Sequence, residues 1–202
     1  MGLAVSHELH SLPWSSGDDA THVARSAMYL TAVQAEGGFA CPITMTFAAV
    51  PALRAAPAVA AEWEPRLTAR SYDPALRPSG EKHSALCGMA MTEKQGGSDV
   101  RANTTSAQPL PGADGEYELT GHKWFCSAPM CDLFLVLAQA PCSSISLDAL
   151  ARLPSLSFRR WMWKALRVPS GRIRGRAKHV MPSGACASTR KRSHIGAEQN
   201  HL

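Results

Sequence analysis

The sequence predicts an α+β protein in which helices come first and strands follow. Apolar residues follow a helical period up to about residue 69, and they alternate with period two from residue 85 onward. Charge separates a third region, because residues 1–141 carry nine Lys+Arg against fourteen Asp+Glu, whereas residues 142–202 carry twelve against two. We therefore expect a helical segment 1–84, a β segment 85–141 and a basic, irregular tail 142–202.

Composition restricts the class of protein further. The chain has 202 residues, of which 45% are hydrophobic and 18% charged, and this excludes fibrous and wholly disordered proteins. The longest strongly apolar run, 133–138, is too short to cross a bilayer, and residues 1–14 do not resemble a secretion signal. The six cysteines form no C-x-x-C pair. We expect a cytoplasmic protein with no membrane partner, with reduced thiols and with no metal site.

Three helices are expected, over 20–35, 43–55 and 58–69. The first begins after Asp18–Asp19, which can cap it, and ends at Gly37–Gly38. Its apolar stripe consists of Val23, Ala27 and Leu30, which are spaced to face a core, and Ala24 and Met28 widen it. The third begins after Pro57, which suits a helix start.

The strand pattern begins at Ala85. One face of this strand holds Ala85, Cys87, Met89 and Met91, and the other holds Leu86, Gly88, Ala90 and Thr92. Small residues on the second face leave room for another group to approach the backbone closely.

Further strands follow in an arrangement that we expect to be antiparallel and barrel-like. A turn at 112–115 precedes an alternating strand at 116–120, and Gly121 is expected to turn the chain again into a strand over 122–127. Residues 133–137 are apolar throughout and predict a strand buried on both faces. If the sheet ends there, this strand is an exposed edge that favours aggregation.

The polar loop from Thr92 to Ser98 is the first candidate binding element. Two adjacent glycines can turn backbone N–H groups toward an anion or a carbonyl, and Thr92 and Ser98 add hydroxyl groups. Such a loop suits a phosphate, a ring amide or a thioester carbonyl, and a plain surface turn is the alternative. It matches neither a Walker A loop nor a dinucleotide fingerprint.

Two motifs at fixed spacing resemble the acyl-CoA dehydrogenase family. The first runs Met-Ala-Met-Thr-Glu-Lys-Gln-Gly-Gly-Ser-Asp-Val over 89–100, and the second runs Gly-His-Lys-Trp-Phe-Cys-Ser over 121–127. In the family, a T-E-x-x-x-G-S-D loop precedes a G-x-K-x-[WF]-x-[ST] strand by about thirty residues. The Lys-Gln pair, together with segments 41–48 and 70–73, is most similar to the AidB-type adaptive-response branch. The resemblance covers about residues 7–141.

This resemblance implies an FAD cofactor and a set of contacts to it. Thr92 corresponds to the residue that reaches the pyrimidine edge of the isoalloxazine ring, and Ser98 corresponds to the serine at the flavin and thioester end. Phe125 corresponds to the aromatic that packs on the ring, and Ser127 corresponds to the hydroxyl near N5. The expected FAD-binding residues are therefore Met89, Met91, Thr92, Gly97, Ser98, Phe125, Cys126 and Ser127. A core aromatic is the alternative interpretation of Phe125.

The resemblance implies that the reaction is α,β-dehydrogenation of an acyl-CoA. It also implies a homo-oligomer. The catalytic carboxylate of the family belongs to a C-terminal helical domain that has no counterpart here, so no catalytic residue is named. Glu93 and Asp99 are interpreted as turn and cap residues. We expect a truncated chain that retains FAD poorly and is inactive alone.

The basic tail leaves three hypotheses open. It can be an out-of-frame sequence after about residue 141, or a disordered or membrane-surface segment. It can also be a nucleic-acid-binding extension linked to DNA alkylation damage, with phosphate contacts from its arginines and stacking on Trp161 or Trp163. A helix over 156–167 is compatible with its pattern.

Overall fold

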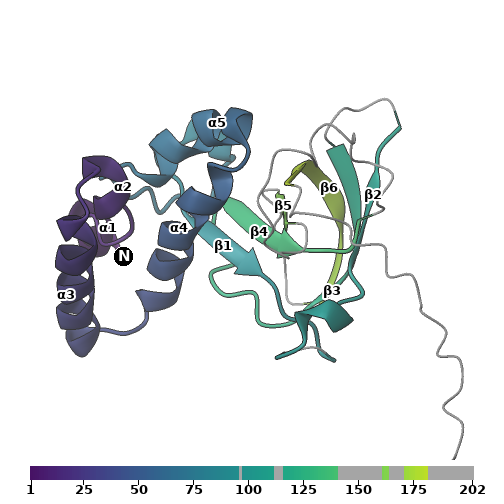
Figure 1. The fold of residues 1–202 in the computed structure, drawn as a ribbon, viewed down its shortest axis with the longest axis horizontal. Coiled ribbons are helices and arrows are strands. Elements are labelled where there is room, and N and C mark those ends of the chain that lie inside the picture. The colour runs from purple at the N-terminus through teal and green to yellow at the C-terminus, as the bar shows by residue number, and fades with distance from the viewer. Residues whose placement is uncertain (96, 112–115, 141–160, 164–170, 182–202) are drawn as a thin grey trace, which may run out of the picture.

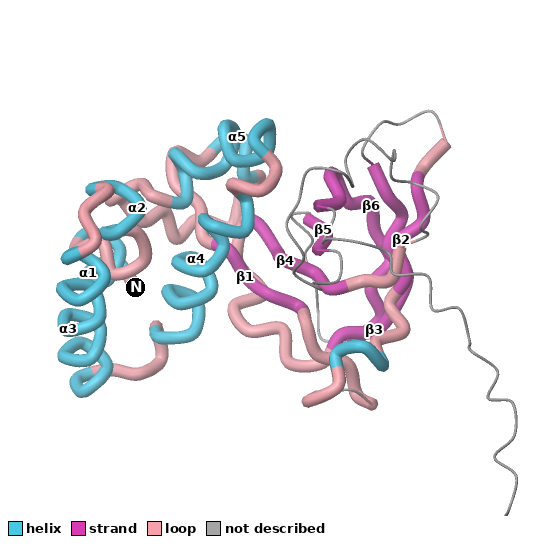
Figure 2. The backbone as a smooth tube through the Cα atoms, viewed as in Figure 1, coloured by secondary structure: helices cyan, strands magenta, loops and turns pink. Residues whose placement is uncertain are grey.

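The computed structural model describes residues 1–95, 97–111, 116–140, 161–163 and 171–181. Helices form one side of the molecule and strands form the other, as Figures 1 and 2 show. The predicted order, helices first and strands second, is therefore confirmed. No helix among these residues has the length and apolar character needed to cross a membrane.

The helical part contains the three predicted helices and two shorter ones. The five helices are α1 (Gly2–Ser6), α2 (Leu12–Ser16), α3 (Ala20–Ala35), α4 (Ala40–Leu53) and α5 (Pro57–Leu67). The predicted start of α3 directly after Asp18–Asp19 is confirmed. The N-cap residue Asp19 makes no side-chain cap hydrogen bond, and Asp18 Oδ1 accepts the Ala20 amide at 2.9 Å instead. Helices α1 and α2 span five residues each, too few for a helical period to show in the sequence.

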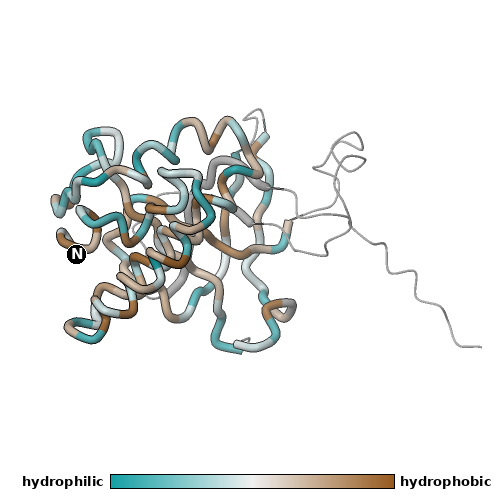
Figure 3. The backbone as a smooth tube through the Cα atoms, turned by 60° about the vertical axis from the view of Figure 1, so that its left-hand side comes forward, coloured by the Kyte–Doolittle hydropathy of each residue, from teal (hydrophilic) through white to brown (hydrophobic). Residues whose placement is uncertain are grey.

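The face on which α3 packs differs from the predicted one. Val23 and Leu30, which belong to the predicted stripe, are 74% and 63% exposed. The helix instead contacts its neighbours through Arg25, whose Nε donates to the Leu9 carbonyl at 2.7 Å, and through Tyr29, whose hydroxyl donates to the Ala40 carbonyl at 3.0 Å. Figure 3 shows hydrophobic and hydrophilic residues interleaved along this part of the chain. Hydrogen bonds and ring contacts decide this orientation.

The strands form one six-stranded sheet in the order β1-β4-β5-β6-β3-β2. Their bounds are Cys87–Ala90 (β1), Ser106–Pro109 (β2), Glu116–Lys123 (β3), Leu133–Leu137 (β4), Trp161–Trp163 (β5) and Gly171–Met181 (β6). Strands β1 and β4 are parallel, so the expectation of a wholly antiparallel sheet is wrong. Residues 91–132 carry the chain back before β4 begins, so β4 runs in the direction of β1. A parallel bridge also joins Ser106 to Gln139.

The chain after residue 141 contributes strands to this sheet. β5 pairs with β4, and β6 pairs with both β5 and β3. The expectation of an irregular tail is therefore wrong over 161–163 and 171–181, and so is a helix through 161–163. Consequently β4 is an internal strand with all five residues buried, and the predicted exposed edge is not present there. The turn at 112–115 and the rest of the tail lie outside the described residues.

Strand β3 is continuous through Gly121, where a turn was expected. The glycine is required there for space, because a Cβ atom at this position would lie 2.3 Å from Thr105 Oγ1 and 2.6 Å from Thr105 Cα. The close approach brings the segment after the polar loop against the second motif. The strand ends at Lys123, so the aromatic residues of that motif follow in a loop.

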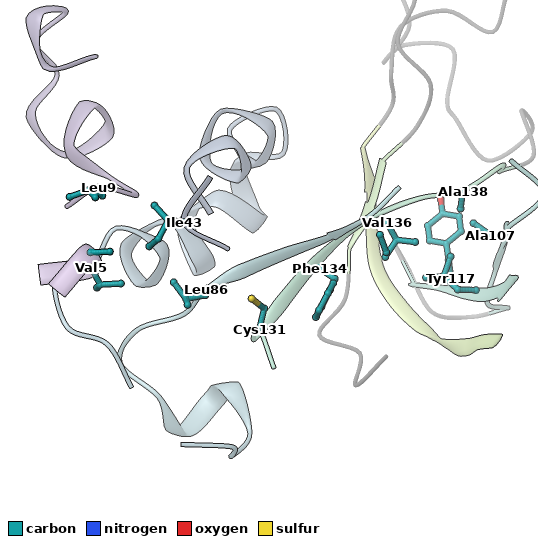
Figure 4. Close-up of a cluster of buried hydrophobic side chains, with 13 residues drawn as sticks. Val5, Leu9, Ile43, Leu86, Ala107, Tyr117, Cys131, Phe134, Val136 and Ala138 are labelled. Carbon is teal, nitrogen blue, oxygen red and sulfur yellow. The ribbon is translucent and has the colours of Figure 1, made fainter. Parts of the chain in front are cut away.

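Two clusters of buried side chains lie on opposite faces of β1 and β4. One cluster includes Leu86, Ala90, Phe134 and Val136, and it extends from α1 to Tyr117 of β3. Figure 4 shows this continuity, from Val5 and Leu9 at the helical end to Tyr117 and Ala107 in the sheet. The other cluster includes Cys87, Leu133 and Leu135, and α4 and α5 cover it. The predicted burial of residues 133–137 on both faces is therefore confirmed.

Candidate functional site

The first motif begins at the end of β1. Met89 lies within the strand and packs against the cluster that α4 and α5 cover. Met91 and Thr92 follow the strand directly and are half-buried. Because β1 is held between α4 and β4, the two residues leave a rigid strand at a defined position.

The polar loop that follows is exposed at its centre. Gly97, Ser98 and Asp99 are all exposed. A Cβ atom added to Gly97 would meet nothing within 4 Å. Steric space therefore does not require a glycine at this position, and the turning of N–H groups toward a ligand stays a prediction. Gly96 lies outside the described residues.

The second motif presents two aromatic side chains to solvent. Trp124 is 42% exposed and Phe125 is 77% exposed. Their ring centroids are 5.7 Å apart with an interplanar angle of 78°. Phe125 has a φ of 60°, a left-handed backbone that is unfavourable for an aromatic residue and is often found at functional sites. Phe125 is therefore not a core aromatic in this structure.

The remaining residues of the second motif are partly covered. Cys126 and Ser127 are half-buried in the loop after β3. Burial raises the pKa of the Cys126 thiol, although nearby Lys123 acts in the opposite direction, so the thiol stays protonated at neutral pH. A further left-handed residue, Ala128 with a φ of 53°, closes the loop.

The structure brings the two motifs together at their backbones. The Trp124 amide donates to the Thr92 carbonyl at 2.9 Å. Lys123 Nζ donates to the Met91 carbonyl at 3.3 Å, and Asn103 Nδ2 donates to the same oxygen at 2.7 Å. Met91, Thr92 and Phe125 therefore belong to one region of the surface, which we call the motif junction and define as residues 91–92 and 123–127.

Hydroxyl groups at the motif junction and in the loop remain available to a ligand. Within the described residues, the side-chain hydroxyls of Thr92, Ser98 and Ser127 have no hydrogen-bond partner. No cluster of three or more His, Cys, Asp and Glu residues that could hold a metal lies in this part of the chain. The arrangement combines hydroxyl donors with an exposed aromatic ring. That combination suits a flat conjugated group with polar edges.

Sequence reasoning missed the role of Glu93 and Lys123. Both side chains are fully buried, at 1% and 0% exposure, and Lys123 Nζ lies 2.9 Å from Glu93 Oε1. The interpretation of Glu93 as a turn residue is therefore wrong. One sequence signal pointed to Lys123, because period-two alternation places it on the same face of β3 as the buried Tyr117 and Leu119.

Hollows on the surface lie away from the polar loop. An apolar groove of about 640 Å³ runs between α1 and α3, and a second hollow of about 360 Å³ lies between residues 75–82 and 129–132. Neither is lined by a residue of the Thr92–Asp99 loop. These two hollows therefore do not include the polar loop.

Comparison with known protein families matches two parts of the chain. Residues 1–74 match the N-terminal domain of the adaptive response protein AidB, and residues 88–160 match the middle domain of acyl-CoA dehydrogenases. The second match includes both motifs. It also extends beyond residue 141, where the sequence resemblance was expected to end.

Individual relatives agree with these matches. The chain is 48% identical to AidB of Escherichia coli K12 over 141 residues, which is 69% of this chain and 26% of that protein. It is 42% identical over 72 residues to benzylmalonyl-CoA dehydrogenase of Aromatoleum aromaticum, which covers 35% of this chain and 17% of the relative. The chain thus spans about a quarter or less of the length of these curated relatives.

A solved structure supports the fold. The crystal structure of Caenorhabditis elegans ACDH-11 in complex with C11-CoA superposes with a TM-score of 0.58 at 28% identity. The superposition covers 72% of this chain and 24% of that chain. The helical part followed by strands is therefore an arrangement that this chain shares with that protein.

Proposed function

Because the chain belongs to the acyl-CoA dehydrogenase family and is similar to its AidB-type members, we propose that it forms the flavin-binding face of an FAD-dependent oxidoreductase. One observation carries the proposal. The two family motifs are about thirty residues apart in sequence, yet the hydrogen bond from the Trp124 amide to the Thr92 carbonyl joins them at 2.9 Å. This hydrogen bond connects the segment that contains Thr92 to the segment that contains Phe125 and Ser127, which supports a shared binding surface.

The residues present fit an isoalloxazine ring. Phe125 offers an exposed aromatic surface, which suits stacking against a flat conjugated system. Thr92 and Ser127 lie in the two joined segments, and hydroxyl donors at a ring edge stabilise negative charge that develops on the ring. We propose that Met89, Met91, Thr92, Gly97, Ser98, Phe125, Cys126 and Ser127 contact the flavin. When bound, FAD would supply a hydride acceptor.

An acyl-CoA is the substrate class that we propose. ACDH-11 was solved with C11-CoA, and the Aromatoleum relative is named for an aromatic CoA thioester. The exposed Ser98 lies in the loop that corresponds to the flavin and thioester end in the family. We propose that this hydroxyl orients the thioester end of the substrate.

The buried carboxylate Glu93 does not serve as the base that such a reaction needs. Its side chain is 1% exposed and paired with Lys123, so a substrate carbon cannot reach it. Burial acts to raise the pKa of Glu93, but hydrogen bonds outweigh it and hold the pKa well below the value that suits proton abstraction at neutral pH. We propose that the described residues bind and orient, and we assign no catalytic residue to them.

Titration with FAD tests the proposal. We expect the purified chain to quench flavin fluorescence and to shift the visible absorption band as FAD is added over a wide concentration range. Phe125→Ala should weaken binding about 2- to 12-fold, which corresponds to an aromatic stacking contribution of about 0.5–1.5 kcal/mol.

The matched control is Leu76→Ala. Leu76 is 75% exposed and lies outside both motifs, so this variant should bind FAD like the wild-type chain. A chain that leaves flavin fluorescence unchanged at every FAD concentration would contradict the proposed function.

A further inference from the structure

One buried carboxylate connects the start of the polar loop to the segment that leads into β2. Glu93 Oε2 accepts the Thr104 amide at 2.7 Å and the Thr104 hydroxyl at 2.9 Å. Glu93 Oε1 accepts the Thr105 amide at 2.9 Å and the Thr105 hydroxyl at 2.5 Å. The segment that leaves β1 at Glu93 therefore returns to the same side chain before β2 begins.

The same carboxylate reaches the second motif through Lys123. Lys123 Nζ lies 2.9 Å from Glu93 Oε1, and neither side chain is accessible to solvent. Lys123 Nζ also donates to the Met91 carbonyl at 3.3 Å. One ammonium group thus contacts both the end of β1 and the start of the polar loop, while its own backbone leads into the aromatic loop.

These contacts fix the parts of the backbone that surround the proposed flavin site. The Met91 carbonyl is held from two sides, by Lys123 and by Asn103, so the peptide between Met91 and Thr92 has a set orientation. The Trp124 amide fixes the next carbonyl, that of Thr92. Ser98 stays exposed, while Glu93 before it and Thr104 and Thr105 after it are held together.

We propose that Glu93 and Lys123 are positioning residues that preorganise the motif junction for the flavin. This inference rests on the proposed function and explains what fixes the geometry of the motif junction. The polar loop and the peptide after Met91 take up their binding conformation before a cofactor arrives, because a buried ion pair with six hydrogen-bond donors around one carboxylate fixes them. Preorganisation raises affinity by removing the cost of ordering the loop on binding.

A mild variant tests the proposal without endangering the fold. Thr104 is exposed, and Thr104→Val removes one hydroxyl donor to Glu93 while it keeps the side-chain shape. Loss of a hydrogen bond to a charged group should weaken FAD binding about 10-fold, measured by fluorescence quenching at a temperature where the variant is fully folded. Thr120→Val is the matched control, because Thr120 is exposed on β3 outside these contacts, and its FAD affinity should not change.

A pair of charge variants provides the second test. Glu93→Gln and Lys123→Met each leave a buried partner without its countercharge, so each should unfold readily. The double variant Glu93→Gln/Lys123→Met removes both charges, and we expect it to regain the fold while its FAD affinity stays at least 10-fold below that of the wild-type chain.

The outcomes separate this inference from the proposed function. Wild-type affinity in Thr104→Val, or in the folded double variant, would show that the pair serves folding alone and would overturn the inference. A wild-type chain that does not bind FAD would overturn the proposed function, and the inference with it.

Discussion

The aromatic ring of Phe134 occupies the space that Gly88 leaves open. These two residues are partners in the parallel pair β1–β4, and a Cβ atom at position 88 would lie 2.4 Å from Phe134 Cε1. The sequence predicted that another group approaches the backbone at this small residue. The group is a side chain of the neighbouring strand, and Phe134 is fully buried. The close approach therefore stabilises the strand pair from which the first motif begins.

Gly88→Ala should destabilise the chain. The added methyl group would collide with a fully buried ring, and overpacking of this kind costs about 1–3 kcal/mol. Chemical denaturation would measure the loss in the free energy of unfolding. Gly97→Ala is the control, because its Cβ atom meets nothing within 4 Å, and it should be close to wild type. Equal stability of the two variants would contradict the packing described here.

Phe125→Gly should separate stability from binding. Phe125 has a left-handed φ of 60° and is 77% exposed, so its replacement by glycine relieves backbone strain and removes little packing. We expect the free energy of unfolding to rise by about 1 kcal/mol, while flavin quenching weakens. Ala128→Gly, at a φ of 53°, should give a similar gain in stability and keep flavin binding. A loss of stability in Phe125→Gly would show that the ring packs against the protein.

Acid should weaken the fold through Glu93. Burial acts to raise the pKa of this carboxyl, but hydrogen bonds from Thr104 and Thr105 and from Lys123 outweigh it and hold the pKa well below its usual range. The stabilisation is therefore complete above the unfolded value of about 4.3 and is lost as pH falls below it. Denaturation between pH 5 and pH 3 should show a steeper loss for the wild-type chain than for Glu93→Gln/Lys123→Met. Parallel pH profiles would contradict this prediction.

His10 should make the free energy of unfolding depend on pH in a higher range than Glu93 does. Burial lowers the pKa of this imidazole to about 4, although its contact with the Ala69 carbonyl at 3.2 Å acts in the opposite direction. The unfolded chain therefore binds a proton below about pH 6.5 that the folded chain does not bind until about pH 4. The free energy of unfolding should fall by about 1.4 kcal/mol for each pH unit across this window.

His10→Gln tests the assignment of that slope. Glutamine does not titrate, and its amide can still donate to the Ala69 carbonyl, so the loss between pH 6.5 and pH 4.5 should disappear. His83→Gln alters an exposed imidazole and should keep the wild-type slope. If His10→Gln retains the slope, another group is responsible for it.

Local patterns were sufficient for the main helices and for the buried strand. The helix over 20–35 follows from its spacing and from Asp18, and the strand over 133–137 follows from an unbroken apolar run. The packed face of α3 could not be predicted in this way. Its contacts use the guanidinium of Arg25 and the hydroxyl of Tyr29, so hydrophobic periodicity pointed to the wrong side.

Sheet topology was also beyond a local pattern. Alternation gives the two faces of a strand, but not its neighbours or their direction. The parallel pairing of β1 with β4, and the placement of β6 beside β3, depend on contacts between segments more than forty residues apart in sequence. Lys123 illustrates the same limit, because its period-two position is compatible with burial but does not reveal the partner that neutralises it.

The sequence by itself determined the family, the order of helices before strands and the two motifs with their spacing, since these depend on residue identity and local period. Tertiary structure alone decided that Glu93 of the first motif and Lys123 of the second share one buried ion pair. The physical reason is desolvation. A buried charge is tolerated only where a countercharge and hydrogen-bond donors surround it, and the fold must bring those groups together from distant parts of the chain.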